Sequence, residues 1–174
     1  KKPVKGPEDL AGLKIRTLPN PVITECLRLM GAAATPLAFG EIYTALQAGV
    51  LDGLEHDPPT ILASKFWETS KHYALTQHNF SPLATYFSEA TFNRMDPKLR
   101  EGFLDAARKA AIDTRVHGLE VEKEALKNLA DKGVTIVECD KEAFRKRVAP
   151  QTDNFIKARP EAKPVVDAIR ATQA

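Results

Sequence analysis

Residues 13–31, LKIRTLPNPVITECLRLMG, combine a short strand with a helix and decide how the chain begins to fold. Apolar and polar side chains alternate in residues 13–17, which predicts a strand. Asn20 followed by Pro21 is typical of a helix start, because Asn caps free amide groups and proline fits the first turn. Apolar residues then recur at helical spacing, and Gly31 suits the turn that ends a helix.

The same alternation continues beyond this first unit. Residues 33–37 predict an extended segment, residues 39–49 a second helix, and residues 51–55 another strand or turn. An order of strand, helix, strand, helix, strand favours parallel strands with helices packed against the sheet. We therefore expect an α/β fold.

The remainder of the chain predicts more helix than strand. Aromatic and β-branched residues predict strand over most of residues 72–94. Residues 96–132 predict one long helix, whose apolar stripe changes position midway, so we expect its packing partner to change as well. Residues 134–137 predict a strand, and residues 141–174 predict two short amphipathic helices.

The 174 residues have the composition of a globular protein, with 43% hydrophobic and 28% charged side chains. A net charge of +2 with evenly mixed signs offers no electrostatic footprint for nucleic acid and no polybasic membrane anchor. The apolar runs are too short for a membrane helix, so we expect a protein that is not embedded in a membrane. Lys1–Pro7 lacks the apolar core of an export signal, and we expect any such signal to lie upstream and to be removed.

The sequence contains no motif of an enzyme or of a cofactor site. It has no phosphate-binding loop, dinucleotide-binding turn, nucleophile elbow or zinc-binding HExxH helix. The four histidines lack the close spacing of metal ligands, so we expect no catalytic residue, no metal and no cofactor. Two alternatives stay open: Glu55 and His56 could be the acid–base pair of an enzyme, and Cys26 and Cys139 could be buried thiols or one disulfide.

Arg16 is the first candidate for binding a ligand. It lies near the carboxyl end of a predicted strand, and ligands of α/β sheets collect at that edge. The planar guanidinium group matches the two oxygens of a carboxylate, which gives orientation as well as energy. The alternative is a surface arginine paired with Glu8 or Asp9.

Glu55, His56 and Asp57 follow the next strand and should lie at the same edge of the sheet. Carboxylate and imidazole groups there could form hydrogen bonds with ligand hydroxyls. The alternative is a solvated loop. Phe39, at the start of the second helix, could stack against the carbon skeleton of a ligand or belong to the core.

Three segments, in order, resemble one protein family. They are PEDLAGLKIR at residues 7–16, PLAFGEIYTALQAGVLDG at residues 36–53 and KFWE at residues 65–68. The sequence is similar to the DctP-type solute-binding proteins of tripartite ATP-independent periplasmic (TRAP) transporters. This similarity runs along nearly the whole chain and corresponds to the C-terminal half of the family.

The resemblance implies a periplasmic binding protein-like fold, of which this chain holds mostly the second lobe and the long helix between lobes, with the first lobe largely missing. It divides the chain into four parts. Residues 1–78 would be the ligand-binding part of the second lobe, residues 79–95 hinge and crossover strands, residues 96–132 the helix spanning both lobes, and residues 133–174 a C-terminal strand and helices.

The resemblance also implies the roles of five residues. Arg16 matches the arginine that pairs with the ligand carboxylate, and Phe39 matches an aromatic residue of the pocket. In the stretch DGLEHDP at residues 52–58, His56 replaces the asparagine usual in the family, which changes the groups offered to the ligand. Asn20 and Glu55 would be further contacts with ligand hydroxyls.

The expected function is therefore a solute-binding subunit that is not an enzyme. It would capture a small organic acid, a sugar acid or hydroxy acid, by its carboxylate in the periplasm and deliver it to the membrane permease of a TRAP transporter. Two other functions stay open: an enzyme acting on an α-hydroxy acid through Glu55 and His56, and a ligand-sensing domain with the same fold.

Overall fold

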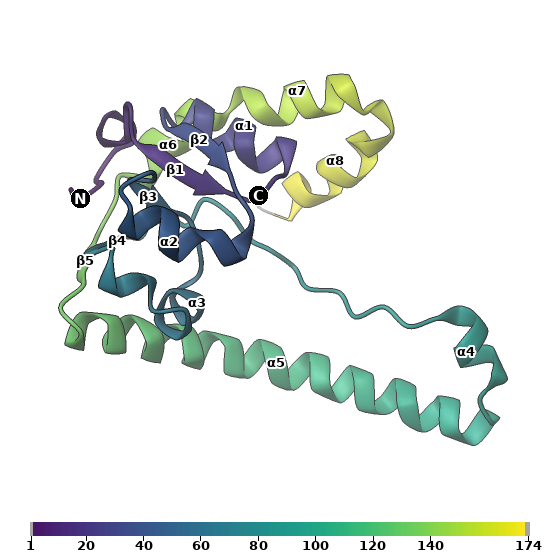
Figure 1. The fold of residues 1–174 in the computed structure, drawn as a ribbon. Coiled ribbons are helices and arrows are strands. Elements are labelled where there is room, and N and C mark those ends of the chain that lie inside the picture. The colour runs from purple at the N-terminus through teal and green to yellow at the C-terminus, as the bar shows by residue number, and fades with distance from the viewer. Residues whose placement is uncertain (1, 173–174) are drawn as a thin grey trace.

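A three-stranded parallel sheet lies in the first third of the chain (Figure 1). The computed structural model describes residues 2–172. The strands of this sheet are β1 (Lys14–Thr17), β2 (Ala33–Pro36) and β3 (Gly53–Leu54). Their order is β2-β1-β3, so the central strand places Arg16 between Thr35 of β2 and Leu54 of β3. The prediction of an α/β fold with parallel strands is confirmed.

A helix follows each of these strands. The side chain of Asn20 accepts hydrogen bonds from two backbone amides of the first helix, and Asp57 caps the third helix through the amide of Thr60. Gly31 ends the first helix with a φ of +107°, a conformation that side chains with a Cβ atom rarely adopt. These helices are α1 (Pro21–Leu29), α2 (Ile42–Gln47) and α3 (Pro58–Ala63), with the 3₁₀ turns η1 (Pro7–Leu10), η2 (Phe39–Glu41) and η3 (Phe66–Glu68).

Two further parallel strands, β4 (His72–Ala74) and β5 (Thr135–Val137), form a second sheet. Between them the chain leaves the body, forms the short helix α4 (Glu89–Arg94), and returns along the long helix α5 (Pro97–Asp131) (Figure 1). The predicted long helix and the predicted strand before residue 138 are confirmed.

The prediction of strand over most of residues 72–94 is wrong. Only residues 72–74 are in a strand, and residues 75–88 run without regular structure to α4. The side chains of Phe80, Leu83 and Tyr86 are exposed. Aromatic residues favour a strand when a neighbouring strand and a buried face are available, and this segment has neither.

The long helix α5 changes its surroundings along its length, as its sequence predicts. Near its C-terminal end, Ala125 and Leu129 are buried, and this part packs against α3. The earlier turns project from the body with α4 at their far end (Figure 1). Their large apolar side chains are exposed at Leu99, Leu104, Ile112, Val116, Leu119 and Val121.

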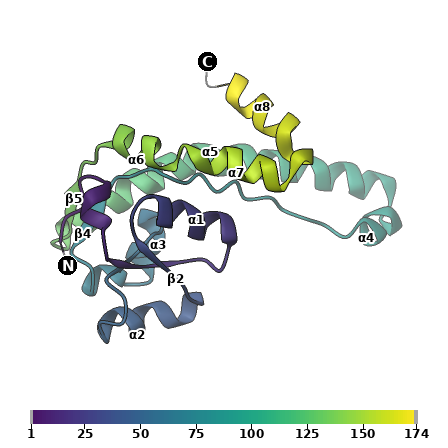
Figure 2. The ribbon, with the colours of Figure 1, turned by 90° about the horizontal axis from the view of Figure 1, so that it is seen from above.

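Three helices end the chain: α6 (Lys141–Val148), α7 (Pro150–Ala158) and α8 (Lys163–Ala171), with the 3₁₀ turn η4 (Pro160–Ala162). The prediction of two helices is therefore wrong. Pro150 and Pro160 lie at the breaks, where a proline lacks the amide hydrogen and restricts the residue before it. Both α6 and α7 pack beside α1, and α8 projects beyond them (Figure 2).

Two apolar clusters hold the body together. The first joins α2, α3 and the end of α5, with Ile42, Phe66 and Leu129 at most 2% exposed. The second joins η1, β1, α1 and α6, with Leu27 and Met30 equally buried. The first sheet is thus held between two apolar clusters that its neighbouring helices share.

Candidate functional site

Arg16 is buried in the central strand β1, with 1% of its surface exposed. Its Nε donates a hydrogen bond to the carbonyl of Leu37 at 2.9 Å, while Nη1 and Nη2 are buried without a hydrogen-bond partner among the described residues. The alternative of a surface arginine is wrong. The carboxylate of Asp9 instead accepts hydrogen bonds from the backbone amides of Lys5 and Gly6. Oε1 of Glu8 lies 4.0 Å from Nη2 of Arg147.

Nη1 and Nη2 of Arg16 are positively charged hydrogen-bond donors, which an anion would satisfy. Burial lowers the pKa of the guanidinium, and the carboxylate of Glu55 opposes this shift. A buried donor without a partner costs free energy, and a charged one costs more. A ligand carboxylate would satisfy both nitrogens at once through two parallel hydrogen bonds.

Glu55 follows Leu54, the residue paired with Arg16 across β1 and β3. Its side chain is only 15% exposed, and burial raises the pKa of its carboxyl, while nearby His56 and Arg16 act in the opposite direction. The solvated-loop alternative is therefore wrong for Glu55. A partly buried carboxylate beside a guanidinium is a strong acceptor for a hydroxyl group.

His56 is held in one orientation by its neighbours. Its Nδ1 lies 2.6 Å from Oδ2 of Asp57, and the hydroxyl of Tyr73 donates to its backbone carbonyl at 3.0 Å. The backbone amide of Asp57 also lies 3.1 Å from Nδ1, so Asp57 occupies this nitrogen in either tautomer, and Nε2 is left for other contacts. The solvated-loop alternative is wrong here too, although Asp57 itself is half exposed.

Phe39 lies at the start of η2 with 46% of its surface exposed, so it is not simply a core residue. Its ring contacts His56 and the buried Phe66, both edge to face, with ring centres 5.6 Å and 5.8 Å away. These two contacts hold the ring, and nearly half of the residue's surface stays exposed. An exposed aromatic face is suited to the carbon skeleton of a ligand.

Asn20 is the N-cap of helix α1, as its position before Pro21 predicts. Its Oδ1 caps α1 by accepting from the amides of Val22 at 2.9 Å and Ile23 at 3.3 Å. This oxygen is therefore already occupied, and only the side-chain amide nitrogen is left for other contacts. A ligand contact of Asn20 stays a prediction.

His78 belongs to this group of residues, and the sequence did not single it out. It lies on the irregular segment after β4, is 17% exposed at its side chain, and places Nε2 4.0 Å from Oε2 of Glu55. Its Nδ1 is 2.7 Å from Oγ1 of Thr76, and burial lowers the pKa of its imidazole. The only signal in the sequence was a lone histidine four residues after a strand end, which no spacing rule identifies.

We call Arg16, Phe39, Glu55, His56 and His78 the Arg16 site. It combines a positively charged fork, an exposed ring, a carboxylate and two imidazoles at one edge of the parallel sheet. This set can bind a carboxylate, stack on a carbon skeleton and form hydrogen bonds with hydroxyls.

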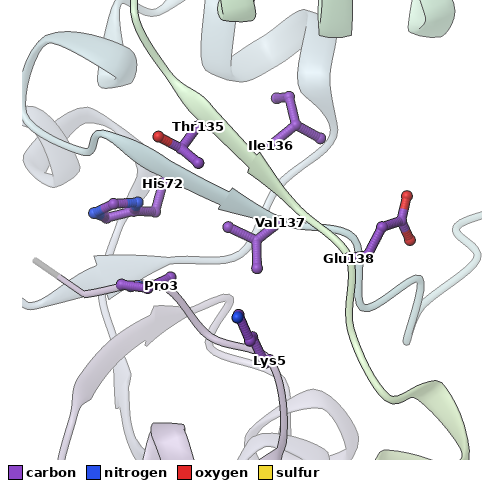
Figure 3. Close-up of a pocket in the computed structure, with 7 residues that line it drawn as sticks. All are labelled: Pro3, Lys5, His72, Thr135, Ile136, Val137 and Glu138. Atoms are coloured by element: carbon purple, nitrogen blue, oxygen red, sulfur yellow. The ribbon is translucent and has the colours of Figure 1, made fainter.

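A separate cavity of about 450 Å³ lies between the start of the chain and β5 (Figure 3). None of its lining residues belongs to the Arg16 site. His72 and Lys5 point into the same region, and Nδ1 of His72 is buried without a partner among the described residues. The lining residues are Pro3, Lys5, His72, Thr135, Ile136, Val137 and Glu138.

Within residues 2–172, no three histidine, cysteine or acidic side chains lie together in a way that could hold a metal ion. None of the helices between these residues combines the length and the apolar character needed to cross a membrane. Cys26 and Cys139 are free thiols, so the disulfide alternative is wrong in this structure.

The chain matches a known family over most of its length. The family model of the bacterial extracellular solute-binding proteins, family 7 (DctP), matches residues 1–158. A solute-binding protein of Chromohalobacter salexigens is 34% identical over 172 residues, which are 98% of this chain and 51% of the relative. The chain thus spans about half the length of the curated relatives it matches.

Solved structures show the same similarity. A TRAP periplasmic solute-binding protein from Roseobacter denitrificans, with bound β-D-glucuronate, is 30% identical with a TM-score of 0.92 and covers 98% of this chain and 57% of its own. A second TRAP periplasmic solute-binding protein, from Polaromonas and bound to D-erythronate, is 38% identical with a TM-score of 0.83. It covers 90% of this chain and 52% of its own. These proteins are binding subunits of transport systems and not enzymes. The expected fold, part of a periplasmic binding protein with its long helix, is confirmed.

Proposed function

Because this chain belongs to family 7 of the bacterial extracellular solute-binding proteins, we propose that it captures a small organic acid in the periplasm and delivers it to the membrane permease of a TRAP transporter. The ligand class is a sugar acid or another hydroxy acid. Arg16 binds its carboxylate, Phe39 stacks on its carbon skeleton, and Glu55 and His56 bind its hydroxyls. No step of this function changes the ligand chemically.

One observation carries this proposal: the guanidinium of Arg16 is buried with Nη1 and Nη2 free. Buried charged donors are normally satisfied by hydrogen bonds, so these two nitrogens favour an anionic ligand. The acids bound by the Roseobacter and Polaromonas proteins support the ligand class, since glucuronate and erythronate each combine one carboxylate with several hydroxyls.

The four parts of the chain also fit this function. We infer that residues 1–78 form the ligand-binding part of the second lobe and that residues 79–95 cross between lobes. Residues 96–132 then span both lobes, and residues 133–174 form a C-terminal strand and helices. The exposed apolar side chains in the early turns of α5 support this division, because a large apolar stripe needs a surface to cover it.

A thermal-shift screen of the full-length protein tests the proposal. The probes are D-glucuronate, D-erythronate, simple hydroxy acids, keto acids and dicarboxylates. A ligand present at about a thousand times its Kd adds about 4 kcal/mol of stability, which raises the Tm by several degrees. A shift with a hydroxylated acid that disappears in Arg16→Ala supports the function, whereas shifts that survive this change, or no shift with any acid, contradict it.

A further inference from the structure

Tyr73 links the two sheets of the body at the point where His56 lies. It is the middle residue of β4, paired with Ile136 of β5, and its ring packs against the first apolar cluster. Its hydroxyl donates to the backbone carbonyl of His56 at 3.0 Å. In the described chain β3 pairs with β1 and β4 pairs with β5, so no strand pairing joins the two sheets there. A side chain of the second sheet therefore holds the loop that follows β3.

The surroundings of the Tyr73 hydroxyl keep its proton in place. Burial raises the pKa of this hydroxyl, and the negative charges of Glu122, Asp57 and Glu55 raise it further. The group therefore remains a neutral donor at any pH near neutrality. Because the bond is partly buried, removing the donor would leave the carbonyl of His56 without a partner in a place that water reaches poorly.

The carbonyl that Tyr73 binds affects where the imidazole of His56 points. It belongs to the planar peptide group between His56 and Asp57, so fixing it restricts the ψ angle of His56. The imidazole is held by Asp57, whose Oδ2 lies 2.6 Å from Nδ1, and by Phe39 in edge-to-face contact, with ring centres 5.6 Å apart. Tyr73 adds to these side-chain contacts a restraint on the backbone that comes from a different sheet.

We propose that Tyr73 is a positioning residue of the Arg16 site. Its hydroxyl fixes the backbone of His56, and the placement of that imidazole determines which hydroxy acid binds best. Tyr73 acts through His56 and not by contact with the ligand. The inference rests on the proposed function and adds to it a residue of β4. Tyr73→Phe keeps the ring in the apolar cluster and removes only the hydroxyl, so the hydrogen bond can be tested apart from the packing.

The test is titration calorimetry of the full-length protein with D-glucuronate, D-erythronate and glycolate. Glycolate carries a single hydroxyl, so the three acids differ in the hydroxyls that they offer to His56. The proteins compared are the unchanged chain, Tyr73→Phe, His56→Ala and the double variant. We expect Tyr73→Phe to raise the Kd about 5-fold for each acid that His56→Ala weakens, and to leave the Kd of any other acid unchanged.

The double variant decides whether Tyr73 acts through His56. In the His56→Ala background, Tyr73→Phe should change the Kd by less than about 2-fold, since no imidazole is left to position. The same 5-fold loss in that background would overturn the inference, because the hydroxyl would then act by another route. If either Tyr73→Phe or His56→Ala binds every acid like the unchanged protein, the inference is also wrong.

Tyr43→Phe is the matched control. Tyr43 also packs against the first apolar cluster, but its hydroxyl donates to Glu68 at 2.6 Å, and Glu68 is not part of the Arg16 site. Tyr43→Phe should therefore leave the Kd of every acid unchanged. A loss of affinity as large as that of Tyr73→Phe would show a general effect on stability and would contradict a specific role of Tyr73.

A measurement without ligand separates this inference from the proposed function. In NMR spectra of histidine side chains, the signals of His56 are those that His56→Ala lacks. Tyr73→Phe should shift or broaden these signals, and Tyr43→Phe should not; unchanged signals in Tyr73→Phe overturn the inference. If Arg16→Ala binds the acids as tightly as the unchanged protein, the proposed function fails, and the NMR comparison still decides whether Tyr73 positions His56.

Discussion

The guanidinium of Arg16 is tied to the carbonyl of Leu37 through Nε alone, at 2.9 Å. This bond links β1 to the residue directly after β2, so two neighbouring strands fix the orientation of the Arg16 guanidinium group. Its remaining nitrogens are buried and free. The strand pairing therefore preorganises Arg16 before a ligand arrives, and little side-chain entropy is lost on binding.

Arg16→Ala should weaken binding of every carboxylate by about 2–5 kcal/mol, because it removes a desolvated charged pair. Arg16→Lys keeps the charge but loses the planar fork, so it should recover only part of this loss. Titration calorimetry measures both. Arg108→Ala, on the exposed surface of α5, is the matched control and should bind like the unchanged protein. Equal affinity of Arg16→Ala would contradict the assignment.

His56→Asn should change the order in which the protein prefers its ligands. The imidazole offers Nε2 because Asp57 holds Nδ1, whereas an asparagine offers an amide of different length that both donates and accepts. The Kd values of four or five hydroxy acids, measured for both proteins, decide this prediction. An unchanged order would mean that His56 supports the site without contacting the ligand.

Asp57 should make the protein less stable as the pH falls. Burial alone would raise the pKa of its carboxyl, but hydrogen bonds from the amide and hydroxyl of Thr60 and from His56 outweigh this and hold it below the ordinary value of 3.8. A carboxyl with a lowered pKa in the folded state stabilises above pH 3.8, and this contribution is lost as the pH falls through the folded pKa.

Urea unfolding between pH 6 and pH 3 measures this contribution. The unchanged protein should lose stability at the acid end, and Asp57→Asn should lose less over the same interval, because its side chain does not titrate. Asn is also a good N-cap, so α3 should remain folded in the variant. Identical acid profiles for the two proteins would show that Asp57 contributes nothing to the pH dependence.

Asn20→Ala should destabilise the protein by about 0.5–2 kcal/mol, because α1 loses the cap on two amides. Asn20→Ser keeps a capping oxygen and should restore most of this stability. The same pair of variants tests the predicted ligand contact. If serine restores the free energy of unfolding but not the ligand affinity, the side-chain amide of Asn20 contacts the ligand; if it restores both, Asn20 acts only as a cap.

The sequence predicts well where local rules decide the structure. Asn20 and Pro21 mark the start of α1, and alternation between residues 13 and 55 predicts the parallel sheet. Because the carboxyl ends of parallel strands share one edge of a sheet, the sequence also predicts that Arg16 and Glu55 lie at the same edge. Each of these inferences needs only neighbours in sequence or a general property of parallel strands.

Features that depend on distant contacts could not be predicted in the same way. His78 joins the site only because residues 75–78 turn toward Glu55, which lies 23 positions earlier in the chain. The aromatic residues after β4 predict a strand, but their exposure shows that no partner strand is present for them in the described chain. Tertiary surroundings, and not composition, decide such segments.

The helix α5 is anchored to the described body at its C-terminal end. It has 35 residues, so at about 1.5 Å per residue it is about 50 Å long, and its last turns are the part that packs against α3. The distance along the helix from Ala125 to Pro97 is about 42 Å, and a tilt of about 10° at the packed end moves Pro97 by about 7 Å. In the proposed two-lobed protein, where the early turns pack against the other lobe, a slight repacking around Leu129 would therefore move that lobe by about the size of a side chain.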